Sequence, residues 1–127
     1  MRFKLVPAAL VVAFIGAVAL PGIATAGGGY DTHVNIKEAA PGDFHGVVKS
    51  EKQKVCAKGR KVTLYKQKGH DQKPSKDEKI HSDTASLSGG KYRWDTGNTG
   101  TKGKVYARAK KTDQCDADNS KTIKSSK

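Results

Sequence analysis

Two cysteines constrain the fold of this chain more than any other feature of its sequence. Cys56 and Cys115 are the only cysteines, and both lie after an N-terminal segment with the pattern of an export signal. Because exported proteins fold in an oxidising compartment, one disulfide between them is the leading prediction, ahead of a metal pair or two free thiols. The bond closes a loop over 59 positions (115 minus 56). In the chain-entropy model this destabilises the unfolded chain by about 4 kcal/mol.

Residues 1–26 have the three parts of a secretory signal peptide. Arg2 and Lys4 precede an apolar run over residues 5–20, and the segment ends in Ala-Thr-Ala at 24–26. The alternative is an uncleaved membrane anchor, which needs about 20 apolar residues. The run is shorter, Pro7 interrupts its start and Pro21 ends it. We therefore predict cleavage after residue 26, a secreted, extracellular protein, and no transmembrane segment after cleavage.

Cleavage leaves 101 of the 127 residues, which is enough for one domain and too few for two. Residues 27–42 hold three consecutive glycines, a proline and few apolar side chains. This composition predicts a flexible N-terminal segment, followed by a folded domain over residues 43–127.

Short stretches with alternating apolar and polar residues predict β-strands throughout the domain. They are 44–50, 61–67, 90–95 and 104–110, with weaker candidates at 78–84 and 121–124. No window of a dozen residues has the apolar stripe of a helix. Glycine-rich and charged turns separate the strands, and the segment 68–79 is predicted to be an exposed loop. Five to seven short strands without helices indicate a β-sandwich or a small barrel.

The predicted core is small, so a chain of this size depends on its cross-link. It consists of Phe44, Val48, Val62, Leu64, Ile80, Leu87, Tyr92, Trp94, Val105, Ala107 and Ile123. Tyr92 and Trp94 lie on one face of their strand, and we expect them at the centre of the core; the alternative is a platform for a ligand.

Four motifs resemble the transthyretin-like (prealbumin-like) β-sandwich superfamily. They are Val-x-Leu-Tyr at 62–65, Ser-Asp-Thr at 82–84, glycine followed by Tyr-x-Trp at 90–94, and Gly-x-Val-Tyr-Ala at 103–107. With the flanking cysteines, the chain looks most like small secreted proteins of Gram-positive actinobacteria. The resemblance implies an all-β Greek-key β-sandwich of about seven short strands, used as a stalk, spacer or adhesion module without catalytic chemistry. Related adhesin repeats carry a Lys–Asn isopeptide bond, but nothing marks Lys49 and Asn119 as such a pair.

The exported part carries a formal charge of +10, because two of the 24 basic residues lie in the signal and 12 residues are acidic. Of the remaining 22 basic residues, 19 are Lys and three are Arg. Arginine grips phosphate in a fixed geometry, so a surface dominated by lysine indicates diffuse attraction. The partners we expect are an anionic cell-wall polymer or an acidic glycan, with nucleic acid bound only non-specifically. We expect a monomer.

The alternation in the strands 61–67 and 104–110 assigns one face to cations and tyrosines. If the two strands share a sheet, this face is a hypothetical binding surface; its residues are Lys61, Tyr65, Lys104, Tyr106, Arg108 and Lys110. The alternative is that both tyrosines cover the sheet edges or pack under loops.

Motifs for catalysis or metal binding are weak. His81, Ser82 and Asp83 are consecutive, and neighbours on a strand point to opposite faces, so they do not form a triad. His81 and Asp83 share a face and, with His45, make an incomplete zinc site. The acidic stretch 116–120 lacks the glycine and glutamate of a calcium loop. We predict no metal and no cofactor.

These observations predict a secreted, non-catalytic module with a structural or binding role at the cell exterior. One alternative is a carbohydrate-binding module that uses exposed aromatic residues. The other is a small secreted hydrolase, such as a nuclease built from His45, His81, Glu51 and Arg60.

Overall fold

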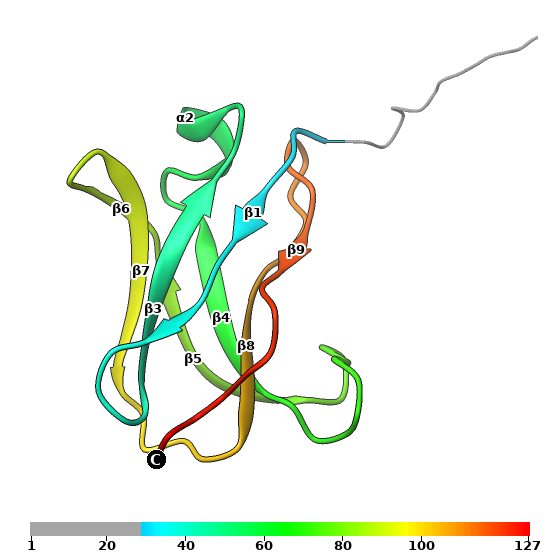
Figure 1. Cartoon of the computed structure of the whole chain (residues 1–127). Coiled ribbons are helices and arrows are strands. Elements are labelled where there is room, and N and C mark those ends of the chain that lie inside the picture. Colours follow the sequence, from blue (N-terminus) through cyan, green and yellow to red (C-terminus); the bar gives the residue numbers. More distant parts are fainter. Residues whose placement is uncertain (1–28) are drawn as a thin grey trace, which may run out of the picture.

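Two antiparallel sheets pack face to face in the computed structural model, which describes residues 29–127 (Figure 1). In the β3–β7 sheet the strand order is β1-β3-β7-β6, and β2 also pairs with β3. In the β4–β8 sheet the order is β10-β8-β4-β5, and β9 also pairs with β8. The strands of the first sheet are β1 (His33–Val34), β2 (Lys37–Glu38), β3 (Asp43–Lys49), β6 (Ser86–Ser88) and β7 (Lys91–Asn98). Those of the second are β4 (Lys61–Lys66), β5 (Glu78–Thr84), β8 (Lys104–Ala109), β9 (Asp118–Asn119) and β10 (Ile123–Lys124).

The predicted all-β sandwich is confirmed. The four strongest strand predictions coincide with β3, β4, β7 and β8, and the weaker prediction at 78–84 coincides with β5. The helix α2 (Gln53–Cys56) is a single turn. The chain crosses between sheets after β3, β5 and β7, which is the connection pattern of Greek-key sandwiches. Four of the ten strands within residues 29–127 have only two residues, and the six longer strands are close to the expected seven.

The core lies between the sheets and is built by the alternation that the sequence shows. Phe44, Val48 and Trp94 come from the β3–β7 sheet, and all three are at most 2% exposed. Leu64 and Val105 from the β4–β8 sheet face them and are fully buried. The prediction that Trp94 lies in the core is therefore confirmed.

Leu87 is a wrong core prediction, since 63% of it is exposed. It lies on β6, which has three residues and is the edge strand of its sheet, so neither face of β6 is covered. Ile80 and Ile123 pack against the core and are only partly buried.

The expectation of a flexible segment up to residue 42 is corrected by the structure for residues 29–42. Val34 and Ile36 alternate into the core, with 7% and 3% of their surfaces exposed. The amide of Val34 donates to Asp118 Oδ2 at 2.7 Å, and that of Gly29 donates to Asp116 Oδ1 at 2.7 Å. The glycines and the proline predict a flexible segment, although the stretch contains two core residues. The carboxylates that bind its backbone amides lie about 85 positions further along the chain. The expected signal at 1–26 and residues 27–28 lie outside the described residues.

The predicted disulfide is confirmed between Cys56, at the end of α2, and Cys115. Both cysteines are buried, so the bond links α2 to the segment that follows β8 inside the protein. Tyr30 forms a β-bridge with Cys115, so the N-terminal segment lies next to the disulfide.

Arg60 lies beside the disulfide and is 5% exposed. Its guanidinium donates to Thr32 Oγ1 at 3.0 Å and to the carbonyls of Cys56, Lys110 and Asp116 at 2.9, 2.7 and 2.8 Å. Burial lowers the pKa of Arg60, and the charge of Asp116 opposes this shift. Arg60 is therefore a structural link between four segments. It is not available as the phosphate clamp of the nuclease alternative.

We predict that the Cys56→Ala/Cys115→Ala variant loses about 4 kcal/mol of unfolding free energy, because its unfolded chain is no longer cross-linked. Urea denaturation followed by the fluorescence of Trp94 measures the loss. The wild-type protein with its disulfide reduced is the matched control and should lose a similar amount. A variant as stable as the oxidised wild type would contradict the prediction.

Candidate functional site

The predicted binding face on the β4–β8 sheet is covered. Tyr65 is 2% exposed and Tyr106 is fully buried, and their rings stack with centroids 5.3 Å apart and planes inclined by 9°. The two tyrosines are therefore not surface contacts, which corrects this part of the hypothesis. Their positions agree with the alternative in which both tyrosines pack beneath loops.

The loop 67–77 and the segment 119–122, which follows β8, cover the two tyrosine rings. The hydroxyl of Tyr106 donates to Asp77 Oδ2 at 2.6 Å. Gln72 donates from Nε2 to the carbonyl of Ser120 and to Thr122 Oγ1, both at 2.9 Å. The loop predicted to be exposed thus has an inner side that is hydrogen-bonded over the sheet.

Two further residues of the hypothesis belong to this cover. Arg108 is half-buried and donates from Nη1 to Asn119 Oδ1 at 2.6 Å. In turn, Asn119 Nδ2 donates to Gln72 Oε1 at 2.9 Å. Lys104 is exposed and donates from Nζ to the carbonyl of Gly69 at 3.0 Å. Both groups of the Asn119 amide are used as hydrogen-bonding partners, which gives no support to an isopeptide bond there.

Lys61 and Lys110, the remaining residues of the hypothesis, meet in a hollow of about 240 Å³ next to Arg60. Its lining residues are Gly59, Arg60, Lys61, Thr63, Lys110, Lys111 and Thr112. No carboxylate from residues 29–127 lines it. Sequence reasoning missed Lys111, although its position after Lys110 at the end of β8 was a usable signal.

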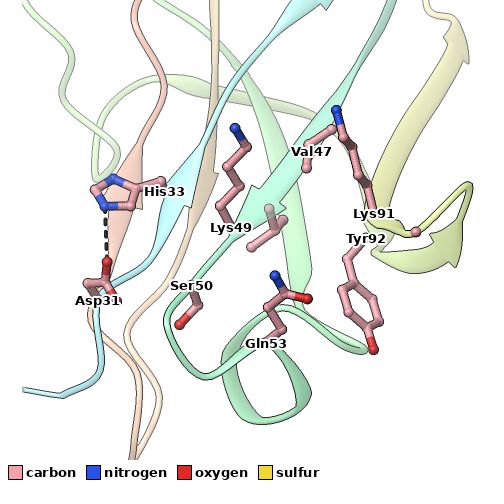
Figure 2. A pocket seen from close by; sticks show the side chains of 10 residues that line it. Asp31, His33, Val47, Lys49, Ser50, Gln53, Lys91 and Tyr92 are labelled. Atoms are coloured by element: carbon pink, nitrogen blue, oxygen red, sulfur yellow. Dashed lines mark ion pairs between the residues drawn. The ribbon is translucent and has the colours of Figure 1, made fainter.

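The outer face of the β3–β7 sheet is the more open of the two sheet faces. His45 and Val47 on β3 are half-buried there, and Lys49, Lys91 and Arg93 are exposed. A hollow of about 410 Å³ lies on this face beside α2 (Figure 2). Its lining residues are Asp31, His33, Val47, Val48, Lys49, Ser50, Gln53, Gly90, Lys91 and Tyr92. No pattern in the sequence marks this hollow, because its residues come from four separate segments.

The polar groups around this hollow differ in whether they have partners. Asp31 pairs through Oδ2 with His33 Nε2 at 3.1 Å, and its Oδ1 accepts from the amide of Glu51 at 3.1 Å. Within residues 29–127, the side chains of Lys49, Gln53 and Lys91 have no hydrogen-bonding or ionic partner. Figure 2 shows the two lysines on either side of Val47, with Gln53 lower in the hollow.

Carboxylates in this protein mostly serve the backbone. Seven of the 12 acidic side chains accept hydrogen bonds from main-chain amides; they are Asp31, Glu38, Asp77, Asp83, Asp95, Asp116 and Asp118. Both ion pairs in the described part of the chain use histidine, His33–Asp31 and His70–Asp71. No lysine or arginine between residues 29 and 127 is in an ion pair.

Glu38 is an example of this structural use. It accepts from the amide of Gly42 at 2.9 Å, from the hydroxyl of Ser125 at 3.1 Å and from the amide of Ser126 at 3.0 Å. The hydrogen bond from Gly42 lowers the pKa of Glu38, with smaller contributions from the two serines. The carboxylate joins β2 to the last residues of the chain.

Only two of the three residues considered for zinc are brought together. His45 and Asp83 line one hollow, where Asp83 Oδ2 accepts from the amide of Asp95 at 2.8 Å, whereas His81 does not line it. In the part of the chain that the structure describes, no three His, Cys, Asp or Glu side chains are placed to hold a metal ion.

Comparison with protein-family models finds no match to this chain, and comparison with curated protein sequences finds none either. The transthyretin-like resemblance therefore stays a prediction from the sequence motifs. None of the helices within residues 29–127 has the length and apolar character needed to span a membrane.

We predict that acid weakens the cover over the tyrosine pair. Burial raises the pKa of Asp77, but hydrogen bonds from Tyr106, Lys68 and Lys73 outweigh this effect and lower it overall. The unfolded chain therefore takes up this proton at a higher pH than the folded protein does. The stabilisation is complete near neutral pH and is lost as the pH falls below about 4.

The Asp77→Asn variant tests this prediction. It should lower the free energy of unfolding by about 1 to 3 kcal/mol near neutral pH, since an amide replaces a carboxylate that accepts several hydrogen bonds. It should also lose less further stability on acidification than the wild type does. Urea denaturation near pH 7 and at about pH 3 measures both effects. Asp113→Asn, at an exposed position, is the control and should change little; equal effects of the two substitutions would contradict the prediction.

Proposed function

We propose that this chain is a secreted, non-catalytic β-sandwich module of transthyretin-like type that binds anionic polymers outside the cell as a monomer. The expected polymer is an acidic glycan or an anionic wall polymer. The proposed contact surface is the end of the sandwich that carries α2, called the α2 end below.

The observation that supports this proposal is the set of unpaired lysines at the α2 end. β3 ends there, β4 and β7 begin there, and β8 ends there (Figure 1). The lysines in or next to these positions are Lys49, Lys52, Lys54, Lys58, Lys61, Lys91, Lys110 and Lys111, and all are exposed. None of them is in an ion pair with another residue between 29 and 127.

The nearby acids only partly offset this charge. Asp31, Glu51, Asp113 and Asp116 lie in or next to the same segments, which gives four carboxylates against eight lysines. Lys52 lies with Nζ 5.6 Å from the ring centre of Tyr30, an interaction that leaves its charge in place. Unpaired cations at one end attract a polyanion over distances up to the Debye length, which is about 8 to 10 Å at physiological salt.

The alternatives from the sequence have less support. The carbohydrate-binding module based on exposed aromatic residues loses Tyr65, Tyr106 and Trp94, because all three are buried. The nuclease alternative loses Arg60 as a phosphate clamp. Lysine also outnumbers arginine on the surface, which favours attraction by charge over a rigid phosphate site.

Salt-dependent retention tests the proposal. The mature protein should bind to an immobilised polyuronate at low ionic strength and elute as salt increases. Lys61→Gln/Lys110→Gln/Lys111→Gln should elute at clearly lower salt than Lys73→Gln/Lys76→Gln/Lys79→Gln, a matched variant with the same change in charge. Retention that persists undiminished in strong salt would refute the electrostatic mechanism. Equal loss in both variants would refute the α2 end as the contact surface.

A further inference from the structure

We propose that the hollow beside α2 shown in Figure 2 is a subsite for one hexuronate residue of an acidic polysaccharide. The inference rests on the proposed function and deepens it, because it names the chemical class of the polymer and the place where one of its sugar residues binds. It concerns the outer face of the β3–β7 sheet, whereas the face predicted from the sequence belongs to the other sheet.

The floor of the hollow fits the face of a sugar ring. Val47 points outward from β3 and is half-buried, with the buried residues Val48 and Tyr92 behind it. A pyranose ring presents C–H groups on its faces, and apolar contact with such a floor removes both surfaces from water. The volume of about 410 Å³ lies within the range of small-ligand sites.

The rim supplies hydrogen-bonding groups for ring hydroxyls. The Gln53 amide is exposed and has both a donor and an acceptor free within the described residues. Ser50 accepts from the amide of Lys52 at 3.1 Å, and its hydroxyl proton is still available to a ligand. Asp31 is held in place by His33 and by the Glu51 amide, so its carboxylate is preorganised.

The two lysines supply the preference for an anion. β3 and β7 pair as far as Val48 and Tyr92, and the next residue beyond each pair is Lys49 and Lys91. Like charges on neighbouring strands destabilise a sheet, and no carboxylate in the described chain pairs with either lysine. A carboxylate between the two ammonium groups relieves this repulsion.

A uronate fits this combination better than other anions do. Phosphate recognition favours the arginine fork or a cluster of main-chain amides, whereas the cations of this hollow are lysines. Binding of single-stranded nucleic acid relies on exposed aromatic faces, and Tyr92 is only 8% exposed. An apolar floor beside paired lysines matches a ring that carries a carboxylate.

The test uses trigalacturonate as the probe and its methyl ester as the neutral control. Binding is measured by calorimetry at fixed salt, and amide shifts in NMR spectra locate the site. The acid form should bind and shift residues around Val47, Lys49, Gln53 and Lys91, and the ester should bind at least about tenfold more weakly. Lys49→Gln/Lys91→Gln should weaken the acid form about tenfold, whereas Lys79→Gln/Lys102→Gln, at the opposite end, should change it less than about twofold.

Val47→Lys separates a shaped subsite from diffuse charge. It adds a cation at a solvent-facing strand position, so diffuse attraction predicts tighter binding, whereas a subsite that needs its apolar floor predicts weaker binding of trigalacturonate. Circular dichroism and Trp94 fluorescence show that each variant is folded. Tighter binding by Val47→Lys, or equal losses in the two double-lysine variants, overturns the subsite and leaves the proposed function standing. Binding of the ester equal to that of the acid, together with polyuronate retention that ignores salt, overturns both.

Discussion

The link between α2, the end of β8 and the N-terminal segment is the constraint on which the rest of the structure depends. Cys56 and Cys115 join two of these parts covalently, and Arg60 joins the same parts through three hydrogen bonds to carbonyls and reaches Thr32 through a fourth. The core between the sheets contains few large side chains, so burial alone stabilises a domain of this size only marginally. The charge of Arg60 is tolerated in the interior because main-chain carbonyls surround it.

A second consequence of the small core is the use made of acidic residues. Seven carboxylates hold main-chain amides in turns and at strand edges, where a larger protein would use more buried apolar surface. Each such carboxylate keeps its negative charge, but none of the seven is in an ion pair with a lysine of the described chain. The positive charge of the surface follows from the excess of lysine over acidic residues, and the hydrogen bonds determine where the acids lie. This connects the stability of the domain to the proposed attraction for polyanions.

The strands and the disulfide were predictable because the strands depend on local patterns and the sequence contains only two cysteines. Val62 and Leu64 alternate with polar positions along β4, and the same holds for Phe44 and Val48 along β3. The candidate site was less predictable. The alternation correctly placed Tyr65 and Tyr106 on the face opposite to Val62, but exposure depends on the loop 67–77, whose Asp77 and Gln72 close over the rings. Similarly, Val34 and Ile36 lie in the core in a segment that pairs with β3 and whose amides at Gly29 and Val34 are bound by Asp116 and Asp118.

The sequence by itself determined the all-β class, the pairing of Cys56 with Cys115 and the excess of lysine, because periodicity, cysteine count and charge are properties of the chain in any conformation. Only the tertiary structure decided which sheet face is open, which lysines gather at the α2 end and that a hollow forms between Lys49 and Lys91. These features depend on contacts between segments that lie tens of residues apart. A strand pattern specifies that a residue points to one side of a sheet, whereas the rest of the chain determines what lies on that side.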